Sequence, residues 1–121
     1  MSETDSHVWK FHKELSAGIV SLVLLGVLAR SRSPMYGYQI AKQLDQHGEG
    51  VLSGKQSALY PVLRNLCAAG LLDSEVEPSV SGPPRRYYRI TPLGRQVLRD
   101  WRQTWTSTRN FVDTVLEGPL P

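Results

Sequence analysis

The sequence predicts a mainly helical protein with one small β-hairpin, and three observations support this class. Four segments are predicted to be helices: the first is apolar on most sides, and the other three carry their apolar residues on one side. Two short runs, residues 71–77 and 85–90, alternate in polarity on either side of a loop rich in Pro, Ser and Gly, which is typical of a hairpin. Thr91 and Pro92 then supply an N-cap and a proline at the first helical position, a strong start signal for the last helix.

The composition is uniform along the 121 residues and indicates one compact unit. The formal net charge of +3 suggests a polyanionic partner. Cys67 is the one cysteine, so no internal disulfide can form and a reducing cytoplasm fits best. The longest apolar run, residues 17–29, is shorter than the roughly 20 residues of a bilayer span, and the acidic residues 1–6 do not form a secretion signal. We therefore expect a cytoplasmic protein without a membrane partner.

The first helix is expected over about residues 16–30, and an extension of it through residues 8–15 is left open. This segment is apolar on most sides, which places it at the centre of the fold. Residues 1–6 are expected to fray. Ser33 and Pro34 break the chain after the first helix.

The second helix is expected to begin between Met35 and Gly37 and to end near His47, before the flexible residues 48–50. Its apolar side is formed by Tyr38, Ile40, Ala41 and Leu44. The remaining side carries Lys42 and Gln43, which look solvated.

A third helix is expected from Ser53, its N-cap candidate, to about Ala69, with Gly70 as the stop signal. Its apolar residues share one face and are Leu59, Val62, Leu63 and Leu66. Pro61 removes a backbone hydrogen-bond donor, so the helix either starts late or bends there.

The two strands of the hairpin have distinct faces, because side chains alternate along a strand. Tyr88 and Ile90 point to one side of the second strand, and the other side carries Arg85, Tyr87 and Arg89. The first strand presents a solvated acidic face formed by Asp73, Glu75 and Glu77.

This order of three helices and a hairpin is that of a winged helix-turn-helix, with the hairpin as the wing. The second and third predicted helices form the helix-turn-helix. In this fold the later helix of these two can enter the major groove of DNA, and the wing reaches phosphates or the adjacent minor groove. Arg85 and Arg86 lie at the base of the wing, where they can neutralise phosphate. Gly82 allows close backbone approach, and the two prolines after it stiffen the loop. The competing interpretation is a solvated hairpin with ordinary surface arginines.

The last helix is expected over residues 92–117, about 39 Å at 1.5 Å per residue. A heptad seam runs along it through Gly94, Leu98, Trp101, Trp105, Thr108, Val112 and Val115. A helix of this length cannot lie wholly on so small a core, so the seam is expected to pack against a symmetry-related copy. Residues 1–91 are therefore assigned to the DNA-binding domain and residues 92–121 to a dimerisation helix and tail, together forming one compact unit.

Candidate DNA readers on the third helix are Lys55, Gln56, Ser57, Tyr60 and Arg64. Lysine, glutamine and arginine can hydrogen-bond base edges, whereas serine and tyrosine hydroxyls suit phosphates. For Tyr60, a half-buried packing role is an equal alternative.

Three segments of the chain resemble the PadR family of bacterial transcriptional regulators: residues 35–40 (MYGYQI), 57–63 (SALYPVL) and 82–91 (GPPRRYYRIT). The resemblance covers about residues 11–116 and implies a homodimeric repressor that binds an inverted repeat in double-stranded promoter DNA. It also implies that the last helix, helped by the first, forms the dimer, and that an effector releases the DNA. The expected DNA-binding residues are Tyr36, Lys55, Gln56, Ser57, Tyr60, Arg64, Arg85, Arg86 and Arg89.

The resemblance further implies a site for a flat aromatic effector. Trp105 falls where members often carry a dimer-interface tryptophan, and in some members paired tryptophans there stack on flat hydrophobic drugs, whereas others sense phenolic acids. The expected effector and dimer residues are Trp101, Trp105, Thr108 and Val112. Ordinary interface packing is the alternative for the two tryptophans, and both roles can hold together. Many members carry Gly-Thr where this chain has Ser57 and Ala58, so Ser57 is the candidate for the hydroxyl contact to phosphate.

No catalytic or metal-binding pattern stands out in the sequence. The three histidines have no metal-binding spacing on a helix, and no phosphate loop or catalytic triad can be proposed. Cys67 lies beside the leucine face of the third helix and is expected to be a buried hydrophobe rather than a nucleophile. We expect no enzymatic activity, no metal and no cofactor. Two other functions stay open: a winged-helix protein-interaction module without specific DNA binding, and a DNA-binding regulator without an effector.

Overall fold

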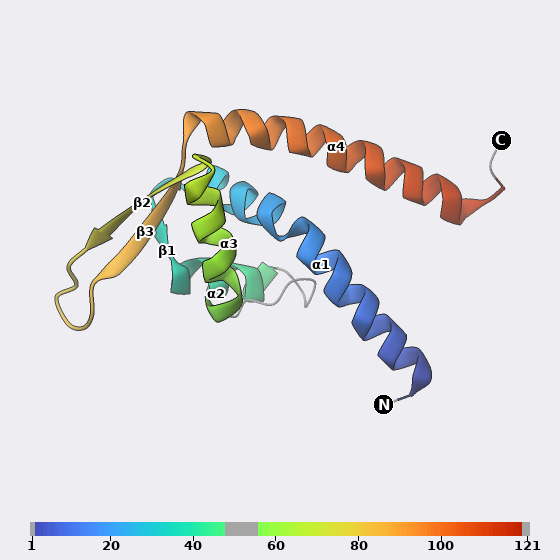
Figure 1. The fold of residues 1–121 in the computed structure, drawn as a ribbon, viewed down its shortest axis with the longest axis horizontal. Helices are drawn as coiled ribbons and strands as arrows, with labels where there is room; N and C mark the ends of the chain where they lie inside the picture. Colours follow the sequence, from blue (N-terminus) through green and yellow to red (C-terminus); the bar gives the residue numbers. More distant parts are fainter. Residues whose placement is uncertain (1, 48–55, 120–121) are drawn as a thin grey trace.

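The protein folds as a small helical unit from which a β-hairpin and two long helices project (Figure 1). The computed structural model describes residues 2–47 and 56–119. In chain order the elements are α1 (Glu3–Arg30), β1 (Met35–Tyr36), α2 (Gly37–His47), α3 (Gln56–Ala68), β2 (Leu72–Glu77), β3 (Arg85–Ile90) and α4 (Pro92–Glu117). The predicted class, a mainly helical chain with a small antiparallel hairpin and a long last helix, is confirmed.

The hydrophobic core lies where α1, α2 and α3 meet the sheet. Each helix contributes leucine or isoleucine side chains, and the buried set is Leu24, Leu25, Leu28, Ile40, Ala41, Leu44, Leu59, Leu63, Leu66, Leu71, Leu72 and Tyr88. The predicted apolar face of the third helix is confirmed, with Val62 partly buried beside it. The assignment of Tyr38 to the core is wrong, because its side chain is 54% exposed. Tyr38 lies in the first turn of α2 and stacks on Tyr36 instead.

The first helix is longer than the sequence suggested. It begins at Glu3, so the extension is confirmed and the expected fraying of residues 3–6 is wrong. The cause is a capping box: the Asp5 N–H donates to the Ser2 hydroxyl at 3.1 Å, and the Ser2 N–H donates to the Asp5 carboxylate at 3.4 Å. These two contacts satisfy backbone N–H groups at the start of the helix, which have no acceptor within the helix, and they stabilise its first turn.

By length and composition alone, α1 could cross a membrane, with a mean hydropathy of 1.5 over its best window. This is weak evidence for a span, since the central helix of a soluble protein passes the same test. Here the C-terminal half of α1 supplies Leu24, Leu25 and Leu28 to the core.

The sheet has three strands in the order β1-β3-β2, and both pairings are antiparallel. The strands β2 and β3 pair from Leu72↔Ile90 to Glu77↔Arg85, as the sequence predicts for a hairpin. The short strand β1 was not predicted. It pairs through Tyr36↔Tyr87, and two residues are too few to show the alternation that marks a strand.

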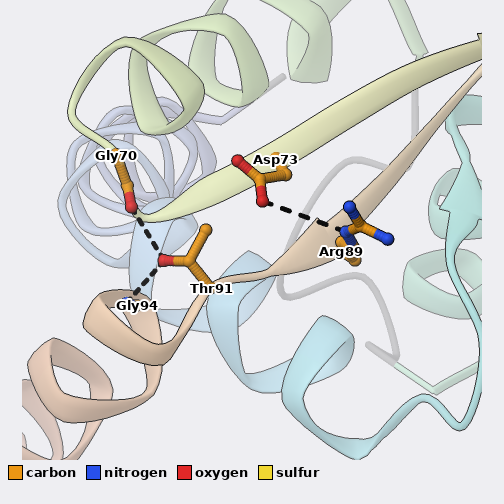
Figure 2. Close-up of polar contacts among 5 residues, drawn as sticks. All are labelled: Gly70, Asp73, Arg89, Thr91 and Gly94. Carbon is orange, nitrogen blue, oxygen red and sulfur yellow. Dashed lines mark hydrogen bonds and ion pairs between the residues drawn. The ribbon is translucent and has the colours of Figure 1, made fainter.

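The junction between α3, the sheet and α4 is held by Thr91 (Figure 2). Its hydroxyl donates to the Gly70 carbonyl at 2.7 Å and accepts from the Gly94 N–H at 2.9 Å. Its backbone N–H donates to the Leu71 carbonyl at 3.1 Å. The predicted N-cap is thereby confirmed, and the same side chain also joins the end of α3 to the start of α4.

Gly70 and Gly94 each have a specific reason to be glycine. Gly70 has φ = 79°, a left-handed conformation that confirms it as the stop signal of α3. Gly94 is buried, and a Cβ placed there would lie 2.1 Å from the Leu71 carbonyl oxygen. Gly94 therefore belongs to this close backbone contact rather than to a heptad seam.

The remaining seam of α4 divides into two parts. Leu98 and Trp101 pack against the core, whereas Trp105, Val112 and Val115 are exposed by 38%, 44% and 43%. The two long helices meet near the sheet and separate toward their free ends (Figure 1). The outer half of each helix therefore carries apolar residues that the described chain does not cover.

Two other sequence expectations concern α3. Pro61 lies inside the helix, so a start after Pro61 is wrong. The expected Ser53 cap, the glycine stop at residues 48–50 and the candidate reader Lys55 lie outside the described residues.

We predict that Gly94→Ala destabilises the protein by about 2–3 kcal/mol, because the new methyl group has to displace the Leu71 backbone. Thermal denaturation at one fixed protein concentration measures the effect. Gly26→Ala is the matched control: it is also helical, but a Cβ there meets nothing within 4 Å, so it leaves stability unchanged or raises it by up to about 1 kcal/mol. Equal stability of the two variants would contradict the packing described here.

Candidate nucleic-acid interface

The wing, defined as β2, β3 and residues 78–84 between them, projects away from the long helices (Figure 1). Gly82 turns its loop with φ = 132°, a conformation that side chains rarely adopt. Pro83 and Pro84 then lead directly into β3, which begins at Arg85. The sequence places the two adjacent arginines at the base of a stiff loop, and the structure confirms that position.

A surface cavity of about 440 Å³, called the notch here, lies between the wing and the helix-turn-helix. It is lined by tyrosines, serines, prolines and arginines, namely Tyr36, Tyr38, Tyr60, Ser79, Ser81, Pro83, Pro84, Arg85 and Arg86. Hydroxyl and guanidinium groups are the side chains that contact DNA phosphates. The structure therefore brings together four of the predicted DNA-binding residues from three separate parts of the sequence.

Arg85 lies over the ring of Tyr36, with its guanidinium carbon 4.5 Å from the ring centroid. Tyr36 is in turn packed edge-on against Tyr87 at 5.4 Å and stacked with Tyr38 at 6.4 Å. Its backbone N–H donates to the Gln39 side chain at 3.0 Å. Tyr36 is thus held by several contacts in addition to its contact with Arg85.

Arg86 points to the opposite face of β3, as its place next to Arg85 in a strand requires. Its guanidinium donates to the Ser74 hydroxyl at 2.9 Å. This face carries the buried Tyr88 and lies next to α3, where Cys67 interacts with both Ser74 and Arg86. The two adjacent arginines therefore present positive charge on two sides of the wing.

Tyr60 combines the two roles between which the sequence did not decide. Its side chain is 40% exposed, yet its ring lies so close to Gly37 that a Cβ there would be 2.8 Å from the phenol oxygen. The contact fixes α3 against the start of α2, and the exposed part of the ring borders the notch. Arg64, one turn further along α3, is exposed on the same side.

Arg89 is not brought to the notch. It lies near the other end of β3 and forms an ion pair with Asp73, with 3.9 Å between the Arg89 Nε and Asp73 Oδ2 atoms (Figure 2). Both side chains are 62% exposed, so the pair adds little stability. Gln56 and Ser57 belong to α3, and their side chains lie outside what the structure describes.

Three notch residues, Tyr38, Ser79 and Ser81, were missed by the sequence analysis. The helical period places Tyr38 on the apolar side of α2, whereas its place in the first turn of that helix is a signal for exposure. The serines lie in the wing loop, and no local pattern indicates which loop residues face the helices.

A second cavity of about 420 Å³ lies between α1 and α4. It is lined by Glu14, Leu15, Gly18, Ile19, Ser21, Leu22, Trp101, Thr104, Trp105 and Thr108. Trp101, Trp105 and Thr108 of the predicted effector set are brought together here, whereas Val112 lies beyond the cavity. The residues from α1 were missed, although the apolar character of that helix on most sides indicated a second contact surface.

The described residues hold no group of three or more His, Cys, Asp or Glu side chains that could bind a metal ion. Cys67 is partly buried, and burial raises the pKa of its thiol more than the Ser74 hydrogen bond lowers it. A thiol with a raised pKa stays protonated at neutral pH and is a poor nucleophile.

Comparisons with known proteins give the family. The profile of the Transcriptional regulator PadR-like family matches residues 24–100. A crystal structure of a PadR family transcriptional regulator from Eggerthella lenta DSM 2243 is 35% identical, covers 96% of this chain and 97% of its own, and superimposes with a TM-score of 0.83. The structure of Bacillus subtilis PadR in complex with operator DNA is 25% identical, with a TM-score of 0.61, and the match covers 69% of this chain and 45% of that one.

The sequence match to Transcriptional regulator Rv3488 of Mycobacterium tuberculosis is 42% identical over 69 residues, which is 57% of this chain and 61% of that protein. These relatives are transcriptional regulators, which confirms the expectation that the chain is not an enzyme. The family profile spans most of the winged helix-turn-helix and the start of α4, and the chain belongs to the PadR-like family of transcriptional regulators.

Proposed function

We propose that this protein is a cytoplasmic transcriptional repressor that binds an inverted repeat in promoter DNA as a homodimer and is released by a flat aromatic effector. The observation that carries the proposal is the notch, where Arg85, Arg86 and three tyrosines gather beside the exposed side of α3. The charge and the hydroxyl groups there suit a phosphate backbone.

The direct contacts to DNA come mainly from α3 and the wing. In a winged helix-turn-helix, α3 enters the major groove, and its exposed Tyr60 and Arg64 lie on the side next to the wing. Arg85 and Arg86 of the wing then reach the flanking backbone. The structure of the Bacillus subtilis relative in complex with operator DNA supports binding of DNA by this chain. The full proposed set is Tyr36, Lys55, Gln56, Ser57, Tyr60, Arg64, Arg85, Arg86 and Arg89. Arg89 contributes charge from outside the notch, and Tyr36 belongs to the set through its place in β1 beneath Arg85.

The homodimer is supported by the uncovered apolar side chains of the two long helices. The outer half of α1 exposes Val8, Trp9 and Phe11 by about 60% or more, and α4 exposes Phe111 and Leu116 similarly. Several large apolar side chains exposed on the same helices indicate an interaction surface. A homodimer that binds an inverted repeat has to hold its two α3 helices about 34 Å apart, the distance between successive major grooves on one side of DNA.

The effector site is supported by the cavity between α1 and α4. Its volume of about 420 Å³ falls in the range of small-molecule sites, and its wall combines Trp101 and Trp105 with Glu14. A compound bound there that favours a different angle between the long helices shifts the dimer away from the DNA-binding spacing.

We predict steep, salt-dependent binding of the protein to the DNA directly upstream of its own gene, and weaker binding to a scrambled fragment. Fluorescence anisotropy over a salt titration measures both. Arg86→Ala weakens binding about tenfold and lowers the salt slope by about one per half-site. Arg109→Ala, which removes an exposed arginine from the outer half of α4, is the charge-matched control and changes neither quantity. Equal, weak binding to both fragments would favour the protein-interaction module instead.

We predict that Val112→Asp converts the dimer to a monomer, because it buries an unpaired carboxylate in the proposed interface. Sedimentation velocity measures the mass, and circular dichroism checks the fold. Asn110→Asp introduces the same charge on nearly the opposite side of α4, about 160° from Val112, and leaves the dimer intact. A dimer that survives Val112→Asp would place the interface elsewhere.

We predict that planar compounds, tested as an acridine dye and a phenolic acid, quench tryptophan fluorescence and lower the affinity for the upstream DNA. Trp105→Ala removes most of the quenching, because the indole forms part of the cavity wall. Trp9→Phe is the control, since Trp9 is exposed on α1 and does not line this cavity. Binding without any change in DNA affinity would leave a DNA-binding regulator that does not respond to these effectors.

A further inference from the structure

Arg85 and Arg89 lie on the same face of β3 but are held in different ways. Arg89 pairs with the Asp73 carboxylate, whereas Arg85 lies over the ring of Tyr36 at 4.5 Å. A carboxylate competes with phosphate for the guanidinium N–H donors. An aromatic face attracts the cation without using those donors, which stay free along the edge of the guanidinium group.

The ring that holds Arg85 is itself fixed. Tyr36 belongs to β1, is paired with Tyr87 in the sheet, and packs edge-on against that residue at 5.4 Å. Its N–H donates to Gln39 at the start of α2. The position of Arg85 is thereby tied to the start of the helix-turn-helix as well as to the wing.

The location of Arg85 and Tyr36 on the surface is equally specific. Both residues line the notch, together with Arg86, the loop serines and Tyr60. An arginine on a bare hairpin samples many rotamers and loses that freedom when it binds. An arginine already stacked over a fixed ring loses less, so its contact with a partner is stronger.

We propose that Tyr36 is a positioning residue that orients Arg85 toward one phosphate of the DNA backbone in each half-site. The inference rests on the proposed function, since it needs a DNA-bound state, and it goes further by assigning Tyr36 an action through Arg85 rather than through its own hydroxyl. The contact sets affinity and register and carries no direct base readout, because phosphates are the same at every step of the DNA.

The test is a double-mutant cycle on binding to the upstream DNA, with a salt titration for each variant. Arg85→Ala lowers affinity about tenfold per half-site and the salt slope by about one. Tyr36→Leu removes the ring, lowers affinity about threefold per half-site, and also lowers the salt slope although it removes no charge. The double variant binds no more weakly than Arg85→Ala alone. Tyr36→Phe keeps the ring and binds like the unmodified protein.

Two controls separate this role from a structural one. Tyr38→Leu removes a neighbouring ring of the notch but leaves the Tyr36 ring beneath Arg85, so it lowers the salt slope less than Tyr36→Leu does. Arg89→Ala removes a charge already paired with Asp73, and it changes the slope less than Arg85→Ala does. Thermal denaturation of all variants tests whether Tyr36→Leu is folded at the assay temperature, as we expect.

The outcomes are distinguishable from failure of the proposed function. Additive effects of Tyr36→Leu and Arg85→Ala, an unchanged salt slope in Tyr36→Leu, or a Tyr36→Phe variant as weak as Tyr36→Leu would each overturn the positioning role while leaving DNA binding intact. Absence of salt-dependent binding by the unmodified protein would overturn both.

Discussion

The hydroxyl of Thr91 is the contact on which the placement of the helices depends. It accepts from the first turn of α4 and donates to the carbonyl of Gly70, just past the end of α3. The Leu71 carbonyl accepts from the Thr91 N–H and lies against Gly94 at a distance that admits no side chain. Short connections leave no linker at this point, so the base of α4 cannot turn without moving α3 and the wing. In the proposed function, a change in the angle of the long helices would reach the DNA-binding surface through this junction.

Strand geometry gives the two neighbouring arginines of the wing different contact partners. Alternation along β3 places Arg86 beside Ser74 on the side of α3, and Arg85 over Tyr36 on the other side. Neither guanidinium is paired with a carboxylate among the described residues, in contrast to that of Arg89. Positive charge that is held in place but not neutralised is what a phosphate backbone can use.

The two long helices carry both stability and exposed apolar surface. The inner part of α1 fills the core with leucines, and the inner part of α4 adds Leu98 and Trp101. Their outer parts leave tryptophan, phenylalanine and valine side chains in contact with water. Such exposure is unfavourable for an isolated chain, and a second copy that covers it would turn the same residues into an interface. The cavity between α1 and α4 lies at the boundary of these two regions, where both a bound ligand and a partner chain would contact the two helices.

The sequence by itself determined the elements whose signals are local. Thr91 and Pro92 defined the start of α4, Gly70 defined the end of α3, and alternation defined β3, because capping, left-handed backbone and strand pleat act within a few residues. The tertiary structure alone decided what depends on distant partners. The strand β1 exists because β3 pairs with it, Tyr38 packs on the Tyr36 ring outside the core, and Arg89 is paired with Asp73 at the end of β3 that is away from the notch. The notch and the cavity between α1 and α4 likewise join segments far apart in the chain, and no local pattern records which side chains will meet when the chain folds.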